Sequence, residues 1–408
     1  MVLGMPTISK RRKALQKLPS GLYDSFQSII VRIRECPREG QAELGMQVLM
    51  WLHFAYRPLK VAELQHALAV EKSDSEFDTS NIPPQKVLID CCLGLVLVDE
   101  ETLTVRFVHY TLEEYFRKHF RAEFPDGYSS VAETCLTYLN FGKLKQHCKN
   151  LNTLREKMEQ YAFLNYAALY WGIHFRQQCN DSLTKLAKTI VEHESERPPC
   201  AIQALYLGLD KSRPSRRLPI ARKFSGIHII AYFGLCEYMA YLCKVERHNN
   251  LEQMDDSDRT PLSWAAEYGH EYIVQMLVER DDVYINSKDS KLGRTPLSWA
   301  ADRGHGAVVR LLMKRGDIDI NTKDKSGRTP LVFAARKGHH AVVQLLIERD
   351  EVDINPMAFC GQTPLILAAE RGHEPVVQLL VGVVICMYSV DPLILFCLSK
   401  ASHTNPIR

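Results

Sequence analysis

Apolar residues in the C-terminal half of the chain recur with a period of 34 or 35 residues. Four segments begin with Thr-Pro-Leu and continue to Ala-Ala, and a fainter copy precedes them; the five start at Ser225, Thr260, Thr295, Thr329 and Thr363. In each full copy a threonine suited to capping a helix precedes a proline at the first helical position, and a glycine follows to end the helix. Paired apolar residues then predict a second helix. The pattern therefore predicts helix pairs joined by hairpins.

One such helix pair cannot bury its apolar face alone, so neighbouring pairs must stack into a solenoid. The unit resembles the ankyrin repeat. That resemblance implies protein binding on the concave side, through hairpin tips and the exposed ends of the first helices. Carried to matching positions, it assigns the tips to Arg259, Arg294, Arg328 and Gln362, and the helix ends to Tyr268, Arg303, Lys337 and Arg371.

These positions are rich in cations, which suggests a ladder for an acidic partner. Glu267, Asp302 and Glu370 interleave with the cations, so a merely solvated face is the alternative. Trp264 and Trp299 stand where the family usually has leucine, and we interpret them as packing residues rather than as a binding strip.

Histidines also recur with the repeat, at His270, His305, His339 and His373. Helices pack roughly 8–10 Å apart, whereas bonds to a metal ion are about 2 Å long. Histidines one repeat apart are therefore poorly placed to share an ion. We expect a structural role for them in the turn between the two helices, and we expect neither a metal nor a cofactor.

The N-terminal half has a different pattern. Apolar spacing predicts helices over 22–33, 42–54 and 58–68, and a fourth helix opens at Pro83 and Pro84 and ends near Gly94. Residues 95–98 and 103–108 predict two strands around a tight turn. A capping box at 111–114 then predicts another helix. Helices followed by a two-stranded wing predict a winged helix.

Residues 14–26, 55–69 and 106–115 resemble the winged-helix module that follows the NACHT nucleotide-binding domain in fungal NACHT and ankyrin-repeat proteins. Residues 161–176 resemble the helical connector of the same family. The module carries the name of a GPI inositol deacylase. We expect no such activity, because the sequence has no Gly-x-Ser-x-Gly nucleophile turn.

The expected fold is mainly α: a winged-helix domain and a helical connector followed by an ankyrin-repeat solenoid. The predicted parts are an N-terminal segment that would be the remnant of a NACHT end (1–19), the winged helix (20–120), the connector (121–224), the repeats (225–381) and an irregular apolar tail (382–408). The predicted repeats are 225–259 (degenerate), 260–294, 295–328, 329–362 and 363–381 (truncated). Linkers are expected at 194–199 and 211–222, which are rich in charge and proline.

Composition narrows the class of protein. The 408 residues are 46% hydrophobic and 24% charged, as in globular multidomain chains, and a net charge of +3 is too even to imply a polyanion partner for the whole chain. The 12 cysteines form no Cys-x-x-Cys, so we expect reduced thiols. The first residues lack the pattern of a secretory signal. We expect a cytoplasmic location, although Lys10 to Lys13 leave a nuclear one open.

The tail leaves three readings open: an eroded or mispredicted segment, an irregular cap, or a membrane span, which Gln378 and Asp391 would interrupt.

For function, we expect a non-catalytic adaptor or scaffold of intracellular signalling with a protein partner and a NACHT domain in cis or in trans. One alternative is that the chain is the regulatory part of a NACHT NTPase. The nucleotide-binding motif Gly-x-x-x-x-Gly-Lys-Ser/Thr does not occur in this chain, so the nucleotide-binding domain would not be part of it. The other is DNA binding by the winged helix, against which its net charge of about −2 over 83–109 argues.

Overall fold

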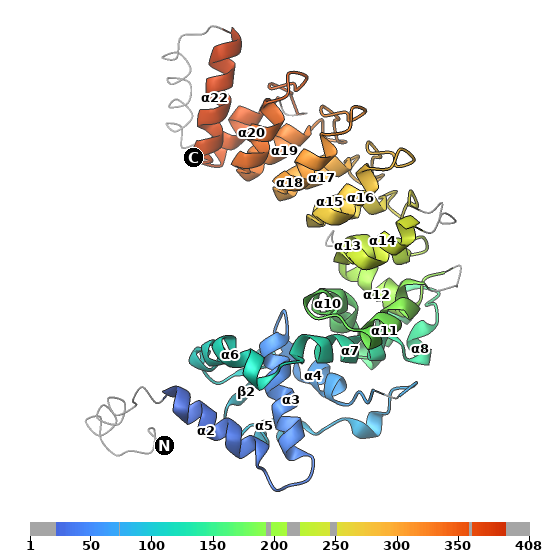
Figure 1. The fold of residues 1–408 in the computed structure, drawn as a ribbon, viewed down its shortest axis with the longest axis vertical. Coiled ribbons are helices and arrows are strands. Elements are labelled where there is room, and N and C mark those ends of the chain that lie inside the picture. The colour runs from blue at the N-terminus through green and yellow to red at the C-terminus, as the bar shows by residue number, and fades with distance from the viewer. Residues whose placement is uncertain are drawn as a thin grey trace, which may run out of the picture. The chain divides into compact units, whose positions relative to one another are not determined.

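The computed structural model describes residues 22–72, 74–192, 197–209, 221–244, 251–358 and 361–388. These residues form two compact units, one of residues up to 190 together with 199–220, the other of 191–198 together with 221 onward. Figure 1 traces the elements of each unit in chain order, from blue at α2 to red at α22. The predictions for residues 1–19, including Lys10 to Lys13, and for most of the two linkers lie outside the described residues.

The first unit is built from helices around a small sheet. Its elements are α2 (Leu22–Arg34), α3 (Gln41–Phe54), β1 (Leu59–Lys60), α4 (Val61–Leu68), a 3-10 helix (Thr79–Asn81), α5 (Gln85–Asp90), β2 (Val96–Asp99), β3 (Thr104–Phe107), α6 (Tyr110–Glu123), α7 (Gly127–Leu139), α8 (Gly142–Lys145), α9 (Leu151–Gln160), α10 (Leu164–Gln177), α11 (Asp181–Val191) and α12 (Cys200–Leu209).

The wing of this unit has three strands rather than the two predicted. β2 and β3 pair antiparallel as expected, with Val96 opposite Phe107. β1 adds to the other side of β3, with Leu59 opposite Val105, so the sheet order is β1-β3-β2. The sequence pattern placed residues 58–60 in a helix. Two residues are too few to show the alternation that identifies a strand.

The predicted capping box at 111–114 is also wrong in its position. Helix α6 already begins at Tyr110, so Thr111 lies inside its first turn. His109 provides the cap instead, because its Nδ1 accepts a hydrogen bond from the Thr111 backbone N–H at 3.2 Å. A ring nitrogen can satisfy an unpaired N–H at a helix start as a hydroxyl does.

Aromatic side chains fill the core of the first unit. The Trp51 ring on α3 lies 5.3 Å from the Phe163 ring and 6.0 Å from the Tyr166 ring. Tyr166 and Trp171 on α10 are fully buried. The interpretation of residues 161–176 as core is confirmed for these two rings.

The second unit is a stack of helix pairs. Its elements are α13 (Gly226–Phe233), α14 (Cys236–Lys244), α15 (Pro261–Tyr268), α16 (Glu271–Val278), α17 (Pro296–Arg303), α18 (Gly306–Leu312), α19 (Pro330–Lys337), α20 (His340–Ile347), α21 (Pro364–Glu370) and α22 (Glu374–Tyr388). The first helices of successive pairs pack on one another in one layer, and the second helices pack in another. We call this stack the array.

Local sequence explains where the helices of the array begin and end. Thr295 caps α17 by accepting from the Ser298 N–H at 3.2 Å, Pro296 occupies the first helical position, and Gly304 ends the helix with a φ of +79°. The same arrangement recurs at α15 and α19. At α21 the cap is again a threonine, but Arg371 follows the helix and Gly372 comes one residue later. The predicted helix pairs are confirmed.

The degenerate first copy also forms a helix pair, whose first helix begins with a capping box of Ser225 and His228. The Ser225 N–H donates to His228 Nδ1 at 3.1 Å, so Nε2 carries the proton that His228 donates to the Gln253 carbonyl at 2.9 Å. The imidazole is fully buried. Burial, and to a lesser extent the charge of Arg259, lowers the pKa of His228 to about 4.

This histidine makes the stability of the array depend on pH. Because the pKa of His228 is lower in the folded state than the usual 6.5, the unfolded chain takes up the proton first, and stability is lost as the pH falls from 6.5 toward 4. At pH 5 the loss is about 2 kcal/mol relative to pH 7. Urea denaturation at both values should show a smaller drop for His228→Gln. The exposed His340→Gln is the control and should keep the wild-type drop.

The C-terminal end departs from the expected boundary. The second helix of the last pair was expected to end near Leu380, with an irregular tail from 382, but α22 continues to Tyr388. The apolar run 381–388 contains no proline, and its single glycine, Gly382, does not end the helix. Residues 389–408 lie outside the described residues. Within the described part of the chain, no helix has both the length and the apolar character needed to cross a membrane.

Candidate partner-binding surface of the array

A buried aspartate organises the hairpins that lead into α15, α17 and α19. The Asp289 carboxylate accepts from the backbone N–H groups of Leu292 at 2.5 Å and Arg294 at 3.0 Å, and from the Trp299 indole at 3.2 Å. Asp255 binds the hairpin before α15 in the same way and accepts from the Trp264 indole at 3.0 Å. Each carboxylate thus fixes both the turn and the tryptophan of the following helix.

The arginines predicted at the hairpin tips do not lie there. Arg259 and Arg294 are only 9% and 7% exposed. Their guanidinium groups turn inward over the indole rings of Trp264 and Trp299, at 3.7 and 4.5 Å from the ring centroids. The aspartate-anchored turn closes at each arginine, which therefore stands just before the capping threonine instead of at the tip. For these two residues the predicted exposed position is wrong.

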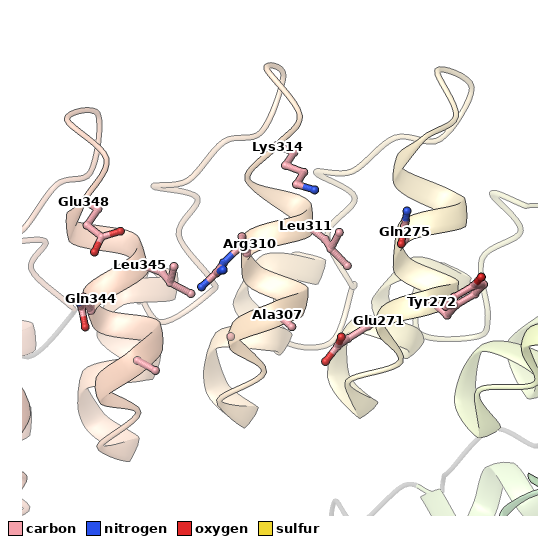
Figure 2. Close-up of a pocket in the computed structure, with 12 residues that line it drawn as sticks. Glu271, Tyr272, Gln275, Ala307, Arg310, Leu311, Lys314, Gln344, Leu345 and Glu348 are labelled. Atoms are coloured by element: carbon pink, nitrogen blue, oxygen red, sulfur yellow. The ribbon is translucent and has the colours of Figure 1, made fainter.

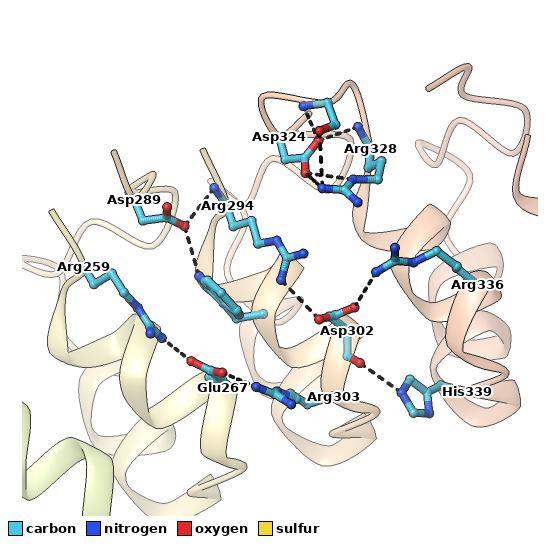
Figure 3. A network of polar contacts seen from close by, with 12 residues as sticks. Arg259, Glu267, Asp289, Arg294, Asp302, Arg303, Asp324, Arg328, Arg336 and His339 are labelled. Atoms are coloured by element: carbon cyan, nitrogen blue, oxygen red, sulfur yellow. Dashed lines mark hydrogen bonds and ion pairs between the residues drawn. The ribbon is translucent and has the colours of Figure 1, made fainter. Parts of the chain in front are cut away.

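Each of these two arginines pairs with a carboxylate on the first helix that follows it in the chain (Figure 3). An arginine from the next repeat contacts the same carboxylate. Glu267 binds Arg259 at 2.6 Å and Arg303 at 2.5 Å. Asp302 binds Arg294 at 3.1 Å, and Arg336 of the next repeat lies 3.4 Å away. The alternation of signs seen in the sequence is therefore a set of ion pairs that link neighbouring repeats, and it neutralises most of the predicted ladder.

Of the other predicted positions, some form side-chain contacts within the array and some are exposed. Arg328 pairs with Asp324 at 2.8 Å, and Gln362 donates to Glu370 at 3.2 Å. Tyr268 is 37% exposed and packs edge-on against Tyr232, and burial raises its pKa to about 12. Lys337 and Arg371 are exposed.

Trp264 and Trp299 are 4% and 9% exposed. Both indole N–H groups are occupied by the hairpin aspartates. The interpretation of these tryptophans as packing residues is confirmed, and neither ring is available to stack on a ligand.

The recurring histidines bind the preceding repeat. His305 Nε2 donates to the Glu267 carbonyl at 3.0 Å, and His339 Nε2 donates to the Asp302 carbonyl at 3.1 Å. Each imidazole occupies the space beside the glycine that ends the preceding first helix, so that a Cβ on Gly304 would stand 2.6 Å from His339 Nδ1. The predicted structural role is confirmed, with the addition that the histidine reaches across to the preceding helix pair.

Sequence reasoning missed the cations that do stand at the tips. Lys288 and Lys291 on one hairpin, and Lys323 and Lys325 on the next, are all exposed. Lys288 Nζ donates to the Lys323 carbonyl at 3.1 Å, and Lys325 Nζ donates to the Ser290 carbonyl. Within the described part of the chain, Lys288, Lys323 and Lys325 pair with no carboxylate. The sequence signal for these exposed lysines is a Lys-Asp pair in each of the two hairpins, in which the aspartate turns inward and the lysine outward.

Comparison with known families supports both parts of this architecture. The model described as ankyrin repeats (3 copies) matches residues 201–289, 227–324, 283–358 and 316–392. The model described as the GPI inositol-deacylase winged helix domain matches residues 36–125. No curated protein matches the chain. Ankyrin repeats are typically non-catalytic modules of protein–protein interaction, and the name of the winged-helix model is no direct evidence of catalysis. The chain combines a winged-helix domain with an array of ankyrin repeats.

Proposed function

We propose that the chain is a non-catalytic adaptor whose array binds an acidic segment of a partner protein. The observation that carries this proposal is the group formed by Lys288, Lys323 and Lys325, which we call the tip lysines. They stand on neighbouring hairpins, and the aspartates of those hairpins are buried and turned toward backbone N–H groups.

The exposed tip lysines and the buried arginines that precede the first helices have different roles. Arg259 and Arg294 are held by carboxylates of their own helices, so their charge stabilises the array rather than attracting a partner. Exposed cations without a carboxylate partner remain available to an acidic segment, and they steer its approach. Exposed Lys337 and Tyr268 at the ends of first helices would extend the same surface.

The test is a selection of unstructured 12-residue peptides from a display library on the full chain, followed by affinity measurement for one selected peptide. We expect the selected peptides to be acidic. The triple variant Lys288→Glu, Lys323→Glu, Lys325→Glu should weaken binding at least about tenfold, because it replaces attraction by repulsion. Its helical circular dichroism should be unchanged, since all three side chains are exposed.

A matched control reverses three exposed lysines of the first unit, Lys145, Lys149 and Lys185, and so changes the net charge equally. It should leave the affinity unchanged. An equal loss in the control would reduce the effect to net charge alone, and full binding by the tip variant would refute the proposal.

The adaptor role also needs a surface on the winged-helix domain. Leu93, Val108 and Tyr110 are 42%, 48% and 66% exposed, and strand pairing places Val108 beside Leu95 at the base of the wing. We propose that these three exposed apolar side chains dock on a protein, with a NACHT module in cis or in trans as the candidate and a signalling role as the consequence. The same side chains would serve the alternative of a regulatory part of a NACHT NTPase.

DNA binding by the winged helix is disfavoured by the charges on the wing. Arg106 pairs with Asp99, so its cation is not available to DNA phosphates.

A further inference from the structure

The second helices of the array enclose a groove on the opposite layer from the ion pairs described above (Figure 2). It has a volume of about 660 Å³ and runs over α16, α18 and α20. The groove is hollow because small residues, Gly306, Ala307 and Ala341, stand at the starts of α18 and α20. Half-buried Leu311 and Leu345 provide its apolar surface.

Two cations stand in the middle of this groove, Arg310 and Lys314, which lie one helical turn apart. Both are exposed, and neither forms an ion pair with a carboxylate of the described residues. Other arginines of the array do form such pairs, at positions 259, 280, 294, 303, 315, 328, 336 and 349. Glu271 and Glu348 also line the groove, at its two sides.

We infer that this groove, which we call the outer groove, binds an amphipathic helix of a protein partner that places apolar side chains on Leu311 and Leu345 and a carboxylate on Arg310 and Lys314. The two unpaired cations in the middle of the groove favour a carboxylate at the centre of the partner's apolar face, whereas Glu271 and Glu348 leave the lining as a whole without net charge. This surface is separate from the tip lysines, so the inference does not depend on the proposed function.

The shape of the groove favours a helix over a small anion. Its lining comes from three helices that lie side by side, so it extends over two gaps between helices rather than forming one closed pocket. A second hollow of about 610 Å³ continues it along Arg310, Lys314 and Leu345 toward Met313. A helix seated between parallel helices presents residues at i, i+3 and i+4 to such a groove, and the small residues allow its backbone to approach.

The test begins with a display library of 14-residue peptides that have leucine fixed at helical spacing and all other positions random. The library is selected on the full chain, and the selected peptides are then tested for binding to the variant Ala307→Trp, whose indole would fill the groove without changing its charge. We expect the selected peptides to be enriched in aspartate or glutamate beside the leucine stripe. No acidic enrichment, or binders that are insensitive to Ala307→Trp, would overturn the inference.

Affinity measurement then separates the outer groove from other surfaces. The double variant Arg310→Glu, Lys314→Glu should bind a selected peptide at least about tenfold more weakly, because both cations become repulsive. The tip-lysine triple variant should bind this peptide as the wild type does, and the double variant should bind the acidic 12-residue peptides as the wild type does. Complete competition by free glutarate at the peptide's own affinity would assign the groove to a small carboxylate and overturn the assignment to a helix.

Discussion

Glu267→Ala is expected to lower the free energy of unfolding of the array by about 3–5 kcal/mol. The Glu267 carboxylate is buried and binds two guanidinium groups, that of Arg259 in its own repeat and that of Arg303 in the next. Arg259 is itself buried, so the substitution leaves a cation inside the array without its counterion. Urea denaturation of the full chain, with hydrogen exchange of α15 and α17 as the local readout, measures the loss.

Glu370→Ala is the matched control for this prediction. Glu370 holds the equivalent place in the last helix pair, but it is exposed, and among the residues that the structure describes only Gln362 donates hydrogen bonds to it. We expect its removal to cost no more than about 0.5 kcal/mol, as for other exposed polar contacts. An equal cost for the two substitutions would contradict the role of Glu267 as a link between repeats.

The helix pairs could be predicted from sequence because each is specified locally. A residue such as Thr295 needs only the N–H of Ser298, three residues away, to begin a helix, and Gly304 needs only its own freedom at positive φ to end it. The wing strands β2 and β3 are specified by a short turn in the same way. Interactions over three or four residues leave a pattern that can be read along the chain.

The candidate site was predicted less well because its charges are decided by contacts between repeats. Arg294 meets Asp302 eight residues ahead and stacks on Trp299, and Asp302 is then shared with Arg336 of the following repeat. Sequence alone shows alternating signs but not which cations these contacts bury. The same limit hid Lys288 and Lys323, whose exposure follows from the inward turn of the neighbouring aspartates.

Gly304→Ala is expected to cost about 2–4 kcal/mol, from two separate causes. Gly304 has a φ of +79°, which an alanine adopts only with strain. Its new Cβ would also stand 2.6 Å from His339 Nδ1, and it would push away an imidazole that donates to the Asp302 carbonyl. The substitution therefore strains one helix end and also weakens the contact between two repeats. Thermal and urea denaturation of the full chain measure the sum of both effects.

Gly372→Ala separates the two causes, because Gly372 has a similar φ of +70° but no described atom lies within 4 Å of the position of a Cβ. It should cost only the backbone strain, about 1 kcal/mol. The difference between the two losses of stability then measures the contribution of the contact between repeats. In that contact, the histidine of one repeat fills the space beside the glycine of the preceding repeat. If both alanines cost the same, that contact adds nothing, and the recurrence of glycine and histidine would have to be explained within each helix pair.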